Sequence, residues 1–233
     1  MPFPVPTWLD ELPTRRLVGE FSVWSADLVR LADDLDRISP HADMLHIDVA
    51  DGHFAPTMLF FPDLVAAIRK ISVRPIHTHL MLADEVLLSQ VEQFADAGSD
   101  LISIHLENEA VASAALDLLA AKNVAAGMVL KVDTPVGGIA RFLPRLRFVT
   151  LLGTAIGVKG QDLHETAADR LGEAKRLIEA SGARQRIVLA ADGGIRANTV
   201  PLLRSAGADT VVLGSLAFGA PDLAARMNWL HAL

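Results

Sequence analysis

Histidine and aspartate side chains occur two residues apart in short apolar segments of the sequence. His46 and Asp48 are separated by one isoleucine, and His77 and His79 by one threonine. Asp192 ends a third apolar run and is followed by two glycines. In an extended strand, residues two positions apart point to the same face, so each pair projects together. Two imidazoles and two carboxylates that meet at one point would form a site for a divalent cation such as Zn²⁺, Fe²⁺, Co²⁺ or Mn²⁺.

The same residues also fit a structural role. A single buried histidine is more often a hydrogen-bonded core residue than a metal ligand. An aspartate that ends a strand commonly caps the next helix. Spacing alone therefore favours a metal site and a structural role about equally.

Eight apolar or β-branched runs alternate with amphipathic stretches from about residue 17 onward. The runs cover residues 17–23, 44–49, 75–80, 101–106, 124–130, 148–152, 186–190 and 210–213. This alternation predicts parallel strands joined by helices, and eight repeats predict a (β/α)₈ TIM barrel, in which active groups lie at the carboxyl ends of the strands. A doubly wound sheet that binds nucleotide would carry a G-x-G-x-x-G or P-loop pattern, and neither occurs. We expect one catalytic domain at 17–233, preceded by an N-terminal arm at 1–16.

The composition narrows the class of protein. Of the 233 residues, 51% are hydrophobic and 21% are charged, which is typical of a globular protein with a sizeable core. The formal net charge is −7, whereas nucleic-acid and anionic membrane surfaces need clustered positive charge. The chain has no cysteine, which excludes disulfides and thiol chemistry. No secretion signal or membrane-spanning run is visible, so we expect a cytoplasmic protein that binds neither nucleic acid nor membrane.

Four motifs occur in the order found in the ribulose-phosphate 3-epimerase family, which the chain resembles from about residue 19 to 218. They are S-V-W-S-A-D at 22–27, H-I-D-V-A-D-G-H-F-A-P at 46–56, H-L-M at 79–81 and D-G-G-I at 192–195. The second motif is highly specific. The resemblance implies a (β/α)₈ barrel that binds one divalent metal ion and inverts the carbinol carbon next to the ketone of a ketose phosphate.

By position in these motifs, the resemblance implies metal ligands at His46, Asp48, His79 and Asp192, with Zn²⁺ as the expected ion. It also implies that Asp48 and Asp192 are the two acid/base residues. Removing a proton next to a ketone leaves an enediolate, whose negative charge a metal ion stabilises. Inversion needs a base on one face of this intermediate and an acid on the other.

The resemblance further implies substrate contacts for Ser22, His79 and Met81, with Met81 shielding the enediolate from water. We expect the phosphate group at the loops after the last three strands, where backbone N–H groups at helix N-termini can bind it. The residues expected there are Gly157, Lys159, Gly160, Gly193, Gly194, Gly214 and Ser215. Tight turns are the alternative explanation for the glycines, and core filling is the alternative for Met81.

Several positions depart from the pattern of the family. Ala50 replaces a common methionine, Trp24 replaces a smaller residue, and the loop at 155–161 differs from the usual N-P-G-F-G-G-Q. His77 stands where an acidic residue is common, so we expect different contacts behind His79. The proposed ligands are intact, and the substrate-facing changes predict a reshaped pocket. Ribulose 5-phosphate, allulose 6-phosphate and a four-carbon tetrulose phosphate are therefore all candidate substrates.

Two other classes of function stay open. One is a phosphate-binding barrel lyase, a decarboxylase or an aldolase, for which Lys131 is the only candidate Schiff-base lysine. The other is a barrel that binds a sugar phosphate without catalysis. We expect a small-molecule ketose phosphate as the ligand and a homo-oligomeric assembly, and the sequence leaves the roles of His53, His77 and His105 open.

Overall fold

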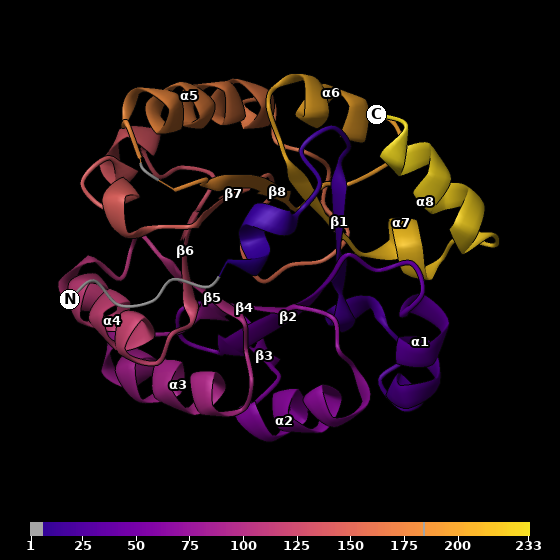
Figure 1. The fold of residues 1–233 in the computed structure, drawn as a ribbon, viewed down its shortest axis with the longest axis horizontal. Helices are drawn as coiled ribbons and strands as arrows, with labels where there is room; N and C mark the ends of the chain where they lie inside the picture. Colours follow the sequence, from indigo (N-terminus) through magenta and orange to yellow (C-terminus); the bar gives the residue numbers. More distant parts are fainter. Residues whose placement is uncertain (1–6, 184) are drawn as a thin grey trace.

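The computed structural model of the protein describes residues 7–183 and 185–233, and its strands form a closed parallel barrel inside a ring of helices (Figure 1). The barrel strands are β1 (Val18–Ser22), β2 (Met44–Asp51), β4 (Ile76–Met81), β5 (Leu101–His105), β6 (Ala125–Leu130), β7 (Phe148–Leu152), β8 (Val188–Asp192) and β9 (Thr210–Leu213). They pair in the order β1-β9-β8-β7-β6-β5-β4-β2, and pairing of β1 with β2 closes the barrel. All eight predicted runs form strands, which confirms the (β/α)₈ fold. A short strand that was not predicted, β3 (Met58–Leu59), pairs antiparallel with the end of β2.

Helices cover the outside of the barrel, with one exception. They are α1 (Leu31–Ile38), α2 (Pro62–Ile71), α3 (Asp84–Asp96), α4 (Glu109–Ala121), α5 (Ala167–Ala180), α6 (Val200–Ser205), α7 (Ser215–Phe218) and α8 (Leu223–His231). Between β6 and β7 the chain instead forms two 3₁₀ turns, η3 (Val136–Ile139) and η4 (Leu143–Arg145). Pro135, Gly137, Gly138 and Pro144 explain this departure, because proline lacks a backbone donor and glycine has low helix propensity.

The side chains inside the barrel lie in layers of different polarity, because alternate residues of each strand face inward. The layer nearest the amino-terminal ends is apolar and consists of Val18, Met44, Leu101, Ala125, Phe148 and Val188. The next layer is polar and fully buried, and includes Glu20, His46, His77, Ser103, Thr150 and Thr210. The layer at the carboxyl ends includes Ser22, Asp48, His79, His105 and Asp192. The predicted reactive groups therefore lie at the end of the barrel where they were expected.

The described part of the predicted N-terminal arm closes the opposite end of the barrel. Its 3₁₀ turn η1 (Trp8–Glu11), the indigo turn near the centre of Figure 1, lies over the amino-terminal ends of the strands. Leu9 is fully buried against the apolar layer. Arg186 donates to the Leu12 carbonyl at 2.8 Å, and Arg147 pairs with Asp10 at 2.7 Å. Residues 1–6 of the arm lie outside the described residues.

We expect Leu9→Ala to lower the free energy of unfolding by about 2–5 kcal/mol, because it leaves a cavity beneath a closed layer. Urea denaturation measures this change. Val29→Ala provides the control, since Val29 is 92% exposed and its truncation should change stability by no more than about 0.5 kcal/mol. Equal stability of the two variants would show that the arm does not seal the barrel.

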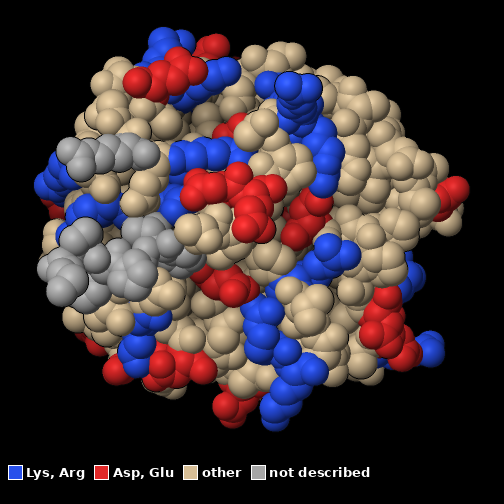
Figure 2. All heavy atoms as spheres, viewed as in Figure 1, with Lys and Arg blue, Asp and Glu red and all other residues tan. Residues whose placement is uncertain are grey.

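Charged side chains of both signs are intermixed over the face of the molecule in Figure 2. That distribution fits the expectation that nucleic acid does not bind, which stays a prediction. Within residues 7–183 and 185–233, no helix has the length and apolar character needed to cross a bilayer.

Candidate active site

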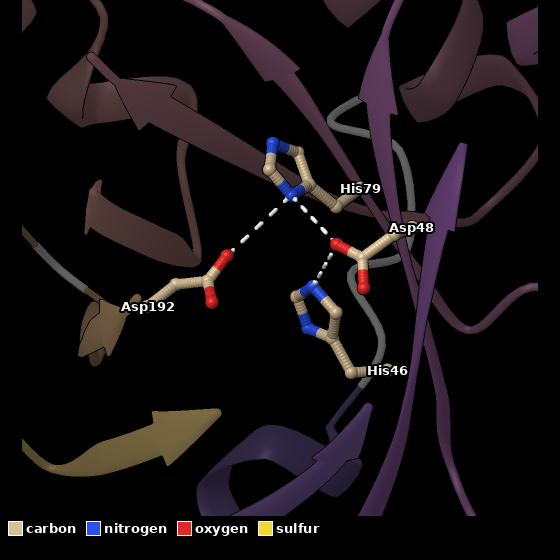
Figure 3. Close-up of side chains that lie close together, drawn as sticks. All are labelled: His46, Asp48, His79 and Asp192. Atoms are coloured by element: carbon tan, nitrogen blue, oxygen red, sulfur yellow. Dashed lines mark ion pairs between the residues drawn. The ribbon is translucent and has the colours of Figure 1, made fainter. Parts of the chain in front are cut away.

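Four side chains from three strands converge at the carboxyl end of the barrel (Figure 3). His46 and Asp48 come from β2, His79 from β4 and Asp192 from β8. His79 Nδ1 lies 3.4 Å from Asp48 Oδ1 and 3.7 Å from Asp192 Oδ2, and His46 Nε2 lies 3.2 Å from Asp48 Oδ1. One nitrogen or oxygen atom of each residue lies within 4.8 Å of those of the other three. The structure thus brings together the predicted quartet.

The hydrogen bonding of this quartet fits a bound cation. His46 Nε2 and His79 Nδ1 are buried, and neither has a hydrogen-bond partner within the described part of the chain. A buried polar atom without a partner is costly. Both nitrogens face the carboxylates, so a divalent ion at the centre would satisfy two imidazoles and two carboxylates at once.

The two carboxylates differ in their surroundings. Burial opposes the charged form of Asp48, but His46 and His79 outweigh this effect and hold the pKa of Asp48 well below its usual value. Burial raises the pKa of Asp192 to about 6, because His46 offsets it only in part and Asp48 adds to it. Pairs of carboxyl groups whose pKa values are pushed apart are typical of acid/base sites.

A cavity of about 340 Å³ opens over the quartet. Asp48, His79 and Asp192 line it, whereas His46 is fully buried beneath them. Every predicted substrate-binding residue lines the same cavity, namely Ser22, His79, Met81, Gly157, Lys159, Gly160, Gly193, Gly194, Gly214 and Ser215. Ser22 Oγ also donates to Asp48 Oδ2 at 2.9 Å, which orients that carboxylate.

The glycine pair after β8 has a structural reason as well as a position in the cavity wall. Gly193 and Gly194 have φ angles of 87° and 69°. A Cβ atom on Gly194 would lie 2.7 Å from the Leu163 backbone. A tight turn therefore explains why both residues are glycines. The same turn places their backbone in the wall of the cavity.

A model described as the ribulose-phosphate 3 epimerase family matches residues 19–218 of this sequence. The chain belongs to this family. Ribulose-phosphate 3-epimerase of Bacillus subtilis (strain 168) is 33% identical over 202 residues, 86% of this chain and 92% of that protein. Ribulose-phosphate 3-epimerase 2 of Cupriavidus necator is 35% identical over 205 residues, 86% of this chain and 84% of that protein. These findings confirm the predicted resemblance and place the chain among the isomerases.

Solved structures share the fold at low sequence identity. A 3-hexulose-6-phosphate synthase superposes with a TM-score of 0.65 at 17% identity, covering 93% of this chain and 98% of that one. Orotidine 5'-phosphate decarboxylase from Pyrococcus horikoshii OT3 gives a TM-score of 0.62 at 16% identity, with 91% and 97% covered. This likeness shows the barrel alone, because one fold hosts many activities.

Two of the predicted departures from the family pattern, Trp24 and Lys159, contact each other in the wall of the cavity. Lys159 Nζ donates to the Trp24 carbonyl at 2.6 Å and lies 4.5 Å from the centroid of its indole ring. Burial lowers the pKa of Lys159, and Asp48 partly offsets this. Arg196, which the sequence analysis missed, also lines the cavity and lies 3.4 Å from the Gln161 carbonyl. The sequence feature that could have identified Arg196 as a second cationic residue of the cavity is its position two residues after the glycine pair.

His77, for which the sequence predicted an unusual set of contacts, meets Glu20 from β1. The two meet at 2.6 Å, and Glu20 also contacts His46, so the rearranged contacts lie behind His46 rather than behind His79. His79 instead meets His105 at 2.8 Å. His53 is exposed, so of the three undecided histidines only His77 and His105 lie in the barrel.

Lys131, the candidate lysine for a Schiff-base lyase, packs on an aromatic ring and not in the wall of the cavity. Its Nζ is 3.7 Å from the centroid of the Phe54 ring, and Lys131 does not line the cavity. A Schiff base requires an amine that can reach the substrate carbonyl. The geometry of the described residues therefore does not favour an aldolase.

Proposed function

We propose that this protein catalyses the 3-epimerisation of a pentulose phosphate, interconverting ribulose 5-phosphate and xylulose 5-phosphate. The observation that carries the proposal is the quartet of His46, Asp48, His79 and Asp192 at the floor of a cavity that also contains every expected substrate-binding residue. Relatives named ribulose-phosphate 3-epimerase, such as that of Escherichia coli K12 at 32% identity, support the substrate class.

The two aspartates exchange the proton. Asp48 projects from β2 and Asp192 from β8, and they approach the centre of the site from opposite sides (Figure 3). One carboxylate removes the proton from the carbinol carbon next to the ketone, and the other carboxyl group delivers a proton to the opposite face. Ser22 holds Asp48 through a hydrogen bond of 2.9 Å. Met81 is 2% exposed and lies at the cavity wall, where it limits access of water to the enediolate.

A single divalent metal ion would be held by His46 Nε2, His79 Nδ1 and one oxygen each of Asp48 and Asp192. When bound, it supplies positive charge that stabilises the developing enediolate. Zn²⁺ is the ion we expect, and Fe²⁺, Co²⁺ and Mn²⁺ also suit this donor set.

Turnover of three ketose phosphates tests the substrate class. We expect kcat/KM to be highest for ribulose 5-phosphate, compared with allulose 6-phosphate and erythrulose 4-phosphate. A higher value for either of the other two would overturn the pentulose assignment and favour the reshaped pocket that the sequence predicts. Cleavage products instead of an epimer would identify a lyase, and binding without turnover would identify a non-catalytic barrel.

Lys159 is expected to contribute charge to phosphate binding. We expect Lys159→Met to raise KM by about 10–100-fold with a smaller change in kcat, because a lost contact to a charged group is worth about 1.5–3 kcal/mol and affects ground state and transition state alike. Steady-state kinetics with ribulose 5-phosphate measures this split. Lys122→Met removes a lysine that pairs with Asp96 on the surface and should leave KM unchanged. An unchanged KM for Lys159→Met would show that this lysine only bridges to Trp24.

A further inference from the structure

Each histidine of the quartet uses its second ring nitrogen for a buried contact. His46 Nδ1 lies 3.1 Å from Glu20 Oε2, and His79 Nε2 lies 2.8 Å from His105 Nε2. A neutral imidazole carries its proton on one nitrogen and a lone pair on the other, and only the lone pair can bind a metal ion. The partner of the second nitrogen therefore decides whether the first one can serve as a ligand.

Glu20 determines which ring nitrogen of His46 carries the proton. The carboxyl group is fully buried and its Oε2 also lies 2.6 Å from His77 Nδ1, while Oε1 accepts a hydrogen bond from Thr210 Oγ1. An ionised carboxylate can only accept, so the proton of His46 lies on Nδ1. The lone pair on Nε2 then faces Asp48 and the centre of the site.

Glu107 determines which ring nitrogen of His79 carries the proton, and it does so through the ring of His105. Glu107 Oε2 lies 3.0 Å from His105 Nδ1, and its other oxygen accepts from the Lys131 backbone at 3.1 Å. The proton of His105 therefore lies on Nδ1, which leaves its Nε2 as an acceptor. His79 must then donate from Nε2, and its Nδ1 lone pair faces Asp48 and Asp192.

We propose that Glu20 and Glu107 are positioning residues that fix the tautomers of His46 and His79, Glu20 directly and Glu107 through His105. This inference rests on the proposed metal site. It also accounts for the position of His77: Glu20 lies on β1, which pairs with the strand of His46, and its Oε2 contacts His77 Nδ1 as well as His46 Nδ1.

Metal affinity tests the role of Glu20 through two substitutions of similar size. Glu20→Gln retains an oxygen that can accept from both rings, whereas Glu20→Met retains none. We expect Co²⁺ and Zn²⁺, measured by competition with a chelator, to bind about 10–100-fold more weakly to Glu20→Met and less than about 10-fold more weakly to Glu20→Gln. His105→Phe, which interrupts the chain to Glu107, should weaken binding to a degree similar to Glu20→Met.

Asp43→Asn provides a matched control, because Asp43 is a partly buried carboxylate that pairs with Arg16 and contacts no residue of the quartet. It should lower stability and leave metal affinity unchanged. Equal metal affinity of Glu20→Met and the wild type would overturn the inference, as would equal losses for the methionine and glutamine variants.

The tautomers themselves provide a readout that does not depend on activity. In metal-free protein labelled with ¹⁵N-histidine, where no ion fixes the tautomers, NMR should show His46 protonated at Nδ1 and His79 protonated at Nε2 in the wild type. In Glu20→Met the Nδ1–H signal of His46 should be lost, while His79 is unchanged. Wild-type protein with the opposite tautomers would overturn the inference.

Moving the carboxylate from position 20 to position 77 gives the most specific test of the role of Glu20. His77 is the register partner of His46 on β4, so Glu20→Ala combined with His77→Asp places an acceptor beside His46 again. We expect the double variant to bind Co²⁺ at least about 10-fold more tightly than Glu20→Ala alone. Failure of the wild type to bind either metal would overturn the proposed metal site. If the wild type binds metal, but Glu20→Met does not weaken binding or the double variant does not restore it, only the inference about the positioning residues would be overturned.

Discussion

Asp192→Asn is expected to lower kcat for epimerisation of ribulose 5-phosphate by about 10²–10⁴-fold, the usual contribution of a positioned general acid or base. The amide keeps the shape of the side chain and an oxygen toward the quartet, but it cannot exchange a proton. Asp48→Asn should have an effect of the same size, because inversion needs both carboxyl groups.

The stereochemistry of solvent exchange separates the two aspartates. In D₂O, a variant that keeps only one of them can still remove and return a proton on one face. Asp192→Asn should therefore incorporate deuterium into one epimer without inverting it, and Asp48→Asn should do so with the other epimer. NMR of the recovered sugar phosphate measures both exchange and inversion.

Two controls make this result interpretable. Asp63→Asn replaces an exposed aspartate on α2 and should leave kcat unchanged. Metal content must be measured for each variant, since both aspartates are also proposed ligands. If either variant retained more than about a tenth of the wild-type kcat, or if both exchanged the same epimer, the opposed-carboxylate mechanism would be wrong.

The meeting of histidine and aspartate side chains at one barrel mouth was predictable because the required information is local, whereas the choice of His46, Asp48, His79 and Asp192 as the four ligands came from the family resemblance. Alternation along a single strand shows that His46 and Asp48 share a face, and the barrel rule places the ends of all strands at one mouth. Each of the eight strands could be located from its own apolar run. Figure 1 shows that the resulting barrel brings β2, β4 and β8 around one centre.

The contacts behind the quartet could not be predicted in the same way, because they depend on which strands become neighbours. The contact of Glu20 with His46 requires closure of the barrel between β1 and β2. The contact of Lys159 with Trp24 joins residues 135 positions apart. One local signal was available: Glu20 is a charged residue within an apolar strand, and such a residue must find partners.

Metal removal is expected to abolish most of the activity without unfolding the barrel. After dialysis against a chelator, kcat should fall by at least about 10²-fold, because two buried carboxylates face the substrate without the charge that stabilises the enediolate. Burial raises the pKa of Asp192 to about 6, and the neighbouring Asp48 carboxylate adds to this rise. Zn²⁺, Co²⁺, Fe²⁺ or Mn²⁺ should restore activity, and the rate with each ion identifies the preferred one.

Thermal stability gives an independent measurement of the same site. An ion that binds only the folded chain stabilises it by about 2.7 kcal/mol at 100 times its Kd, which corresponds to a rise in Tm of about 5–10 °C for a chain of this size. His46→Gln should remove this rise, because the orphaned Nε2 is lost, whereas His164→Gln, at an exposed histidine, should retain it. Full activity in metal-free protein would contradict the proposed chemistry. An equal rise in Tm for both variants would instead place the ion elsewhere, because His46 belongs to the quartet and His164 does not.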